Sequence, residues 1–518
     1  MDTISLGLVC SKLAGDYWLY KKPNEYLKHK SSFLLIIIGF LKDRRDNLHF
    51  TLNKAVKIAV LSLTSLSFAF SSLACDNSQS NVSSNQSFTS SHSKNSSTDE
   101  EIVIRMAMTG NPDIDDVIDG FNSSDNGYRI DVVKYDVSDT SDVNSLQRSD
   151  FELIQDIIKG EIDIICSQSF YDSAYYEILK GKGALADLYT FMEEDENVNC
   201  STLNQHVLQI NELDGKLYSL PTFYGITTLI GKSEYVGTKE NWTTDEFIAH
   251  WKQMPEGSTI CGYTQSENIY RYLLRSNIDT FIDYSSQQVH FDSSEFTKIL
   301  EFCGGFESNH GLKGERNPNA PEFVSTCYID GFSSTAGYFQ TNSPYTIVGY
   351  PSPDGTGSFL RGVDISYSIC ANISSERQRA AWEFIRIFAS YDYQKSHVII
   401  WEENPDYPEL SHFSGERGIP INNQVLEETA REIISGKYSD GTYTVEGVQY
   451  KANLPTEEDY EGFLVFINQI KRWENENHGM IWSIVNEETS SYFSGEKSLD
   501  ETVRMIQSRA GLWISEQS

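Results

Sequence analysis

An alternation of short apolar runs and helix-like segments over residues 101–166 constrains the fold more than any other feature. Residues 101–108 (EIVIRMAM) form an apolar run without strict polar–apolar alternation, which is typical of a strand buried on both faces of a sheet. Further predicted elements follow in the order helix, strand, helix and strand, at residues 114–121, 128–133, 154–159 and 162–166. This order predicts a mainly parallel sheet flanked by helices.

Capping-box patterns mark the starts of three later helices. The pairs are Thr243 with Glu246, Ser375 with Gln378, and Ser498 with Glu501. In such a pair the hydroxyl accepts a hydrogen bond from the backbone three residues on, and the later side chain bonds back. We expect residues 410–460, rich in turn formers and acids, to form long loops or a surface subdomain.

The region around Cys75 predicts export and anchoring. Lys54 and Lys57 precede an apolar stretch, residues 58–70, and the sequence then reads Leu73-Ala74-Cys75. A basic start, a short apolar core and small residues at a cleavage site are typical of a secretory signal. The cysteine after them resembles a bacterial lipobox, although Ser72 stands where such motifs usually have Leu. Lipid on Cys75 would hold the chain to the outer face of a bacterial plasma membrane.

The segments on either side of this signal are expected to lie outside the folded body. Residues 77–98 are dominated by Ser and Asn and have too few apolar side chains to offset their ordering entropy. The apolar run at residues 33–41 is shorter than the roughly 20 residues that span a bilayer. Residues 1–51 are therefore either an over-long start assignment or an N-terminal extension with an interfacial segment.

Composition excludes several classes of function. The chain has 518 residues and a formal net charge of −33, which disfavours binding to nucleic acid because phosphates need clustered Lys and Arg. Roughly 420 residues remain after the leader and tether, enough for two or three domains. None of the six cysteines in this part forms a C-x-x-C pair, so we expect no structural zinc and no other metal or cofactor. Whether these cysteines pair with one another stays open.

Several local sequences resemble one known family. Residues 213–222 (LDGKLYSLPT) look like its "dGKlYalP" stretch, and residues 349–355 (GYPSPDG) like its "G-x-P-x-x-x-G" segment. Residues 380–385 (AAWEFI) and 418–422 (GIPIN) match a helix and a crossover segment, and residues 481–516 are similar to its closing helices. These matches occur in the family's order, and the chain therefore resembles the family-one extracellular solute-binding proteins, the maltose-binding-protein-like group of ABC importers.

The resemblance implies an α/β fold of the periplasmic-binding-protein type (class II), with two lobes, each a mainly parallel sheet flanked by helices, joined by a hinge. It suggests that the chain crosses between lobes near residues 221–225, 361–364 and 417–422. Glycine and proline at these points suit segments that change conformation on closure. The implied organisation is a leader over 1–51, a lipoprotein signal over 52–75, a tether over 76–100, lobe 1 over 101–222 and 363–418, and lobe 2 over 223–362 and 419–518.

The resemblance also implies capture of a sugar or oligosaccharide and its delivery to the transmembrane subunits of an ABC permease. We expect a monomer with no enzymatic activity, since the sequence has no G-x-S-x-G elbow, H-E-x-x-H or phosphate loop. One alternative is a secreted glycoside hydrolase, for which Glu487 and Glu488 are the most visible carboxylate pair. Another is a binding module that feeds a sensor kinase.

A sugar site needs aromatic rings for C–H patches and polar side chains for hydroxyls. Gln168 and Tyr171 follow a predicted strand, where ligands bind in open α/β sheets. The resemblance adds candidates at the crossings, in a polar loop and at a stacking position, namely Phe223, Tyr224, Tyr338, Phe339, Asp364 and Trp482. Arg361 lies at the same crossing as Asp364, and either of the two is a candidate for binding hydroxyls. Each candidate has a structural alternative: a surface loop, hinge packing, a solvated hinge charge at Asp364 or Arg361, or the start of a core helix at Trp482.

Overall fold

A computed structural model describes residues 101–516, apart from several short segments. The segments not described are 110–113, 138–142, 171–173, 275–276, 284–285, 309–318, 341–342, 403–411, 440–441, 446–447, 452 and 475–478. Cys75, the signal, the tether and Tyr171 lie outside the described residues, so the expectations for them stay predictions.

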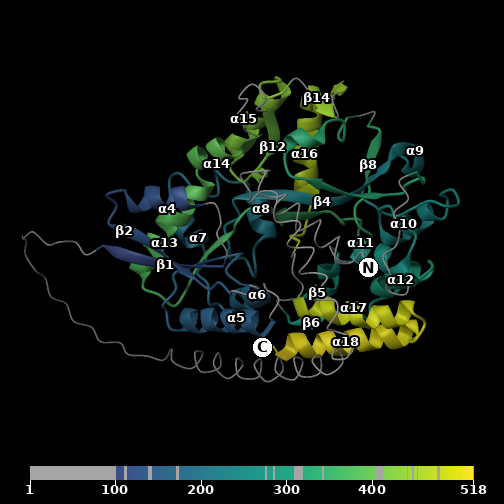
Figure 1. Ribbon diagram of the computed structural model, residues 1–518, viewed down its shortest axis with the longest axis horizontal. Coiled ribbons are helices and arrows are strands. Elements are labelled where there is room, and N and C mark those ends of the chain that lie inside the picture. Colours follow the sequence, from purple (N-terminus) through teal and green to yellow (C-terminus); the bar gives the residue numbers. More distant parts are fainter. Residues whose placement is uncertain are drawn as a thin grey trace, which may run out of the picture. The chain divides into compact units, whose positions relative to one another are not determined.

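The first sheet has the strand order β10–β3–β1–β2. Figure 1 labels two of these strands, β1 and β2. The strands are β1 (Ile102–Met108), β2 (Tyr128–Lys134), β3 (Ile164–Cys166) and β10 (Tyr367–Ile369). β1 pairs in parallel with β2 and β3, and β10 pairs antiparallel with β3. Ile104, Met106, Ala107 and Met108 of β1 are all buried, so apolar side chains on both faces of this strand avoid water. The predicted, mainly parallel sheet is confirmed here.

The second sheet is built around the ten-residue strand β4 (Phe223–Lys232). Its partners are β7 (Ser325–Ile329), β8 (Tyr345–Ile347), β9 (Phe359–Gly362) and β13 (Ile419–Pro420). All of these pairings are antiparallel, whereas the sequence predicted a mainly parallel sheet in each lobe. The difference has a topological cause: β4 takes the chain away from the first sheet and β9 brings it back, so neighbouring strands run in opposite directions.

Two hydrophobic cores lie in the described body, and the second sheet contributes to both of them. The first core contains Ile104, Ile164 and Ile369 of the first sheet and extends to Ile226 and Leu360 at the near ends of β4 and β9. The second core combines the far end of β4, at Leu229, with aromatic residues that include Trp242, Phe247, Phe296 and Phe323. The α/β class and a division into two lobes are therefore confirmed.

Helices flank both sheets. Those in the first part of the chain are α4 (Asp115–Asn122), α5 (Val143–Ile158), α6 (Ala174–Gly181), α7 (Tyr189–Met192) and α8 (Gln205–Ile210). The middle part contains α9 (Ser233–Val236), α10 (Thr244–Trp251), α11 (Ser266–Leu274), α12 (Ser294–Gly304), α13 (Ser375–Ile385) and α14 (Tyr391–His397). The last are α15 (Asn423–Ile434), α16 (Glu457–Gln469), α17 (Gly479–Phe493) and α18 (Leu499–Glu516). None of the described helices has the length and apolar character that crossing a membrane requires.

Short elements complete the described fold. The remaining strands are β5 (Ile282–Asp283), β6 (Gln288–Val289), β11 (Ile399–Glu402), β12 (His412–Glu416), β14 (Thr442–Val445) and β15 (Val448–Lys451). The 3-10 helices are η2 (Ile278–Phe281), η3 (Phe332–Thr335) and η4 (Arg386–Ala389). Residues 410–460, expected to be loops or a subdomain, thus contain α15, whose Val425, Leu426 and Ile433 are buried, because its apolar residues recur at helical spacing.

The capping predictions hold for two of three helices. Thr243 and Glu246 form both bonds of a capping box at the start of α10, and Ser498 accepts a bond from the Glu501 amide before α18. At α13 the cap is Ser374, which accepts from the Arg377 amide, and not Ser375. The adjacent serines make a shift of one residue invisible to the sequence pattern.

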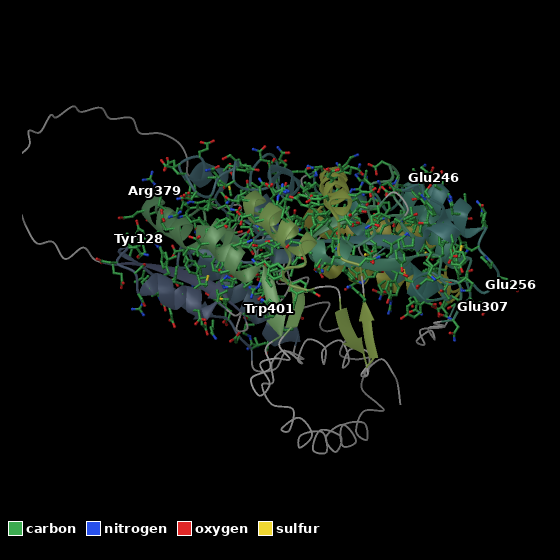
Figure 2. All side chains as sticks on the ribbon, turned by 90° about the horizontal axis from the view of Figure 1, so that it is seen from above. Tyr128, Glu246, Glu256, Glu307, Arg379 and Trp401 are labelled. Atoms are coloured by element: carbon green, nitrogen blue, oxygen red, sulfur yellow. The ribbon has the colours of Figure 1, made fainter. Side chains whose placement is uncertain are left out.

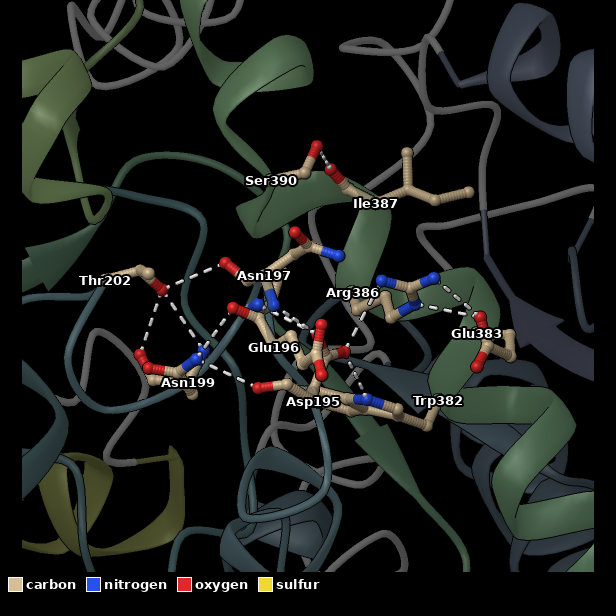
Figure 3. A network of polar contacts seen from close by, with 11 residues as sticks. Asp195, Glu196, Asn197, Asn199, Thr202, Trp382, Glu383, Arg386, Ile387 and Ser390 are labelled. Atoms are coloured by element: carbon tan, nitrogen blue, oxygen red, sulfur yellow. Dashed lines mark hydrogen bonds and ion pairs between the residues drawn. The ribbon is translucent and has the colours of Figure 1, made fainter.

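A buried carboxylate fastens α13 and η4 to the segment after α7 (Figure 3). Asp195 accepts a hydrogen bond from Trp382 Nε1 at 3.0 Å and lies 3.5 Å from Arg386 Nη1. It also accepts from the backbone amides of Asn197 and Val198. Its oxygens are therefore used within the protein, and this network supports the fold.

Candidate functional site

The three predicted crossings lie side by side. Tyr224 at the start of β4 pairs with Gly362 of β9 on one side and with Ile419 of β13 on the other. The segments near residues 221–225, 361–364 and 417–422 therefore meet at one end of β4, although nearly 200 residues of sequence separate the first from the third.

Two glycines allow this close approach. A Cβ on Gly418 would lie 2.9 Å from the Cβ of Phe223 and would also clash with the side chain of Val363. A Cβ on Gly225 would lie 2.9 Å from the Cγ1 of Val363 and would clash with Asp330. The crossings are thus packed so tightly that side chains at these two positions do not fit.

Phe223 and Tyr224 lie inside the packed crossing. Both side chains are completely buried, and burial raises the pKa of the Tyr224 hydroxyl. This is the packing that hinge residues would have, and contact with a ligand stays a prediction for both rings.

Asp364 connects the second crossing to the third. One of its oxygens accepts from the Ile365 amide at 2.8 Å, and the other accepts from Arg417 Nη1 at 3.1 Å. The neighbouring Ser366 accepts a hydrogen bond at its carbonyl from the Ser167 amide at 2.9 Å. Gln168, which follows Ser167 and is exposed, therefore lies in a turn fastened to the segment that carries Asp364.

Tyr338 and Phe339 lie in the loop between β7 and β8. The Phe339 ring packs against Phe463 and Phe466 of α16, with centroids 6.1 and 5.6 Å apart. The half-buried Tyr338 ring meets Tyr345 edge to face at 5.7 Å. Both aromatic rings therefore have protein neighbours, and both pack against the first hydrophobic core.

Two carboxylates hold the backbone of this loop. Glu416, at the end of β12, accepts from the amides of Phe332 and Ser333 at 3.1 and 2.7 Å. Asp459 accepts from the amide of Gly337 and from the side chain of Gln340, while it also caps α16. Burial raises the pKa of Glu416 despite the two amide donors. The loop is thus tied to the strand that leads directly into the third crossing.

Trp482 stands near the start of α17. Its ring is stacked on that of the buried Tyr270 in α11, with centroids 5.4 Å apart and an interplanar angle of 8°. One face of the indole is therefore covered by the second core, as in the structural alternative considered for this residue.

Sequence reasoning named Arg361 but missed the polar and aromatic group around it. We call this group the crossing cluster: Thr227, Tyr328, Asp330, Arg361 and Glu474. Tyr328 lies opposite Thr227, and Arg361 opposite Gly225, so their side chains share one face of the second sheet. The Arg361 guanidinium forms an ion pair with Asp330 and lies 5.1 Å from the centre of the Tyr328 ring. Thr227 Oγ1 donates to Glu474 at 2.7 Å.

Two members of the crossing cluster are accessible to a ligand. Tyr328 is 57% exposed and the Asp330 side chain 45% exposed, next to crossings that are themselves buried. A sequence signal existed for part of it, because polar Thr326, Tyr328 and Asp330 alternate with buried Cys327 and Ile329. No local pattern indicated Glu474, which reaches the cluster from a segment that pairs with β9 at Leu360.

The chemistry that this arrangement offers is recognition of hydroxyl groups beside an aromatic ring. Among the described residues, no group of three or more His, Cys, Asp or Glu side chains could hold a metal ion. The six cysteines of the described body are free thiols. Acidic side chains such as Glu256 and Glu307 stand on the exterior, as Figure 2 shows, in keeping with the acidic composition.

Comparisons with known proteins match the fold only. No protein-family model and no curated protein sequence matches the chain. Similar solved structures include maltose-bound MalE3 of T. maritima, at 15% identity over 80% of this chain and 100% of that one, with a TM-score of 0.43. A family 1 extracellular solute-binding protein from Alicyclobacillus acidocaldarius matches at 12% identity over 80% and 98%, with a TM-score of 0.45. An oligogalacturonide-binding protein from Yersinia enterocolitica matches at 14% identity over 80% and 100%, with a TM-score of 0.49.

Proposed function

We propose that this protein is a lipid-anchored extracellular solute-binding protein that captures a sugar or oligosaccharide for an ABC importer. The observation that carries the proposal is the crossing cluster, in which an exposed tyrosine, an arginine and carboxylates adjoin three chain crossings. Aromatic rings and hydrogen-bonding groups of both kinds are what a sugar's two faces require. The order of family-like motifs along the sequence supports the same function.

The proposed mechanism is closure of two lobes around the ligand. We propose lobes with the boundaries expected from the sequence, and a hinge formed by the crossings near residues 221–225, 361–364 and 417–422. A ligand shifts such an equilibrium only through its greater affinity for the closed state. The crossing cluster lies where a small change in the strands would alter the contacts made to a bound sugar.

The remaining parts of the proposal concern location and partners. Cys75 would carry the lipid, residues 76–100 would act as the tether, and the permease would recognise the closed lobes. Gln168, Tyr171, Tyr338 and Asp364 are proposed to add ligand contacts to the crossing cluster. We also propose ligand contacts for four residues that pack inside the protein, namely Phe223, Tyr224, Phe339 and Trp482.

A thermal-shift screen of the purified protein against sugars, amino acids and polyamines tests the proposal. A ligand that binds the native state raises the apparent melting temperature through RT ln(1 + [L]/Kd). We expect a shift with one class of sugar, recovery of that sugar unchanged, and loss of the shift in Tyr328→Ala. A response to peptides or polyamines, with none to sugars, would contradict the carbohydrate assignment.

The hydrolase alternative depends on Glu487 and Glu488 of α17, and both carboxylates form ion pairs within the protein. Glu488 is paired with Lys497 and Arg509, and Glu487 lies 2.8 Å from Arg509. Burial raises the pKa of Glu488, but hydrogen bonds from Lys497 and Arg509 outweigh it and hold the pKa below its usual value. A general acid needs the opposite shift. The sensor-kinase alternative differs only in the partner and is separated from import by uptake of labelled sugar in cells.

A further inference from the structure

The arginine of the crossing cluster is already neutralised. Arg361 forms an ion pair with Asp330, and its side chain is only 16% exposed. The guanidinium also lies over the Tyr328 ring. An arginine that recognises the carboxylate of a ligand presents its planar fork to that ligand. Here the guanidinium is used inside the protein, so an acidic ligand would have to displace Asp330.

Glu474 differs from Arg361 in the partners of its side chain. Its side chain accepts a hydrogen bond from the Thr227 hydroxyl at 2.7 Å, and its backbone amide donates to the Leu360 carbonyl at 2.6 Å. The backbone bond fixes the residue against the edge of β9. Among the residues that the structure describes, no Lys or Arg forms an ion pair with this carboxylate. It therefore leaves a negative charge on the face that carries Tyr328.

The charged groups near Glu474 do not reverse the negative charge of this face. At the second and third crossings, Asp364 is balanced by Arg417 at 3.1 Å. Among the described residues, the crossing region thus holds four carboxylates, of Asp330, Asp364, Glu416 and Glu474, against three guanidinium groups, of Arg361, Arg417 and Arg472, and the last of these donates to Thr280 Oγ1 at 2.7 Å. The chain as a whole has a formal charge of −33, so its long-range field also repels anions.

We infer that the ligand carries no acidic group and is a neutral sugar or an amino sugar, and that Glu474 sets this selectivity. The inference rests on the proposed function. An amino group gains an ion pair with Glu474, a hydroxyl donates a hydrogen bond to it, and a carboxylate at the same position is repelled. Selection against the wrong ligand by an unpaired like charge is a recognised route to specificity.

The test compares sugars that differ in one substituent. Short oligosaccharides of glucose, glucosamine and glucuronic acid are titrated by calorimetry into the intact protein at low ionic strength and at a pH where the amine is protonated. We expect the neutral and amino sugars to bind at least about tenfold more tightly than the acidic one. Added salt should reduce the gap between the amino and acidic sugars.

Two variants separate a local effect from a global one. Glu474→Gln should weaken the amino sugar, strengthen the acidic one and change the neutral one least. Glu194→Gln makes the same change of net charge at a side chain that is 73% exposed, and should leave the three affinities unchanged. Circular dichroism and melting temperature confirm that both variants are folded.

The outcomes are distinct. Preferential binding of the acidic sugar would overturn this inference and leave the proposed function standing. An unchanged preference in Glu474→Gln would overturn the role of Glu474. Failure of all three sugars, while an amino acid or peptide binds, would overturn the proposed function and this inference together.

Discussion

The two sheets differ in what their strands present to solvent. In the first sheet, four of the seven residues of β1 are buried, including Ala107, whereas Val103 and Arg105 near the start of the strand are exposed. In the second, β7 alternates, so that Cys327 and Ile329 are buried while Tyr328 is 57% exposed. The C-terminal end of β1 is buried on both faces and acts as scaffold, whereas a strand that alternates can carry a binding surface. The comparison indicates that the first sheet serves the fold through its buried side chains, and that the second sheet also presents exposed side chains to a ligand.

The largest expected effect concerns the interior of the first sheet. Asp163 has a fully buried side chain that accepts from Arg377 at 2.7 Å and from the Arg105 amide. Arg377→Ala would leave this charge uncompensated and lower the free energy of unfolding by about 3 kcal/mol, measured by urea denaturation. Arg379→Ala on the same helix removes a 70% exposed guanidinium and should cost less than about 0.5 kcal/mol. Equal losses in the two variants would contradict this account.

This effect should depend on pH. Burial raises the pKa of Asp163, although bonds from Arg105 and Arg377 partly oppose the shift. An acid whose pKa is higher in the folded state binds more protons there, so its contribution to stability falls as pH rises from the unfolded pKa through the folded one. The loss in Arg377→Ala should therefore be full at neutral pH and smaller in acid.

The next effect lies at the crossings, where the two sheets meet. Gly418→Ala would drive a methyl group into Phe223 and Val363, and should lower the free energy of unfolding by about 2 kcal/mol. Gly181→Ala is the matched control, because a Cβ there meets nothing within 4 Å. Chemical denaturation that gives the same midpoint for Gly418→Ala and the parent would show that the crossing is loosely packed.

A smaller effect is expected at Glu416, which joins the third crossing to the loop after β7. Burial raises its pKa above the ordinary value, so the group destabilises the fold increasingly as pH rises through that window. Glu416→Gln should change stability at neutral pH by no more than about 1 kcal/mol, since one amide loses its acceptor while a buried charge is removed. The free energy of unfolding should vary less between acid and neutral pH in this variant. An unaltered pH profile would show that Glu416 is not the group that causes the dependence.

The smallest effect on stability should occur on the exposed face of the second sheet. Tyr328→Ala should alter the free energy of unfolding by less than about 0.5 kcal/mol, because the ring is largely exposed. Ligand affinity, measured by calorimetry, should nevertheless fall at least about tenfold if the ring stacks on the sugar. A large loss of stability would show that the ring belongs to the packed interior. The two sheets would then not differ in the side chains that they expose.

The same contrast explains what the sequence predicts and what it does not. The strands at residues 101–108 and 162–166 are recognisable because they are mostly apolar, and residues 128–133 because apolar residues alternate with the exposed Arg129 and Asp131. The crossing cluster depends on pairings across long stretches of sequence, and Thr227 and Glu474 are 247 residues apart. Antiparallel pairing in the second sheet likewise follows from connectivity, which local patterns do not contain. The packing partners of Phe339 and Trp482 come from α16 and α11 and are equally invisible locally.

The repeated crossings have a consequence for how the chain reaches its native state. β3 ends at Cys166, yet its antiparallel partner β10 begins at Tyr367, so the first sheet is incomplete until some 200 further residues are available. Closure of such long loops slows folding, because entropy is lost before the distant contacts form. In a nascent chain the first sheet therefore cannot be completed before residue 369 has been synthesised. Slow folding of this kind suits a protein that is proposed to be threaded through a membrane before it folds.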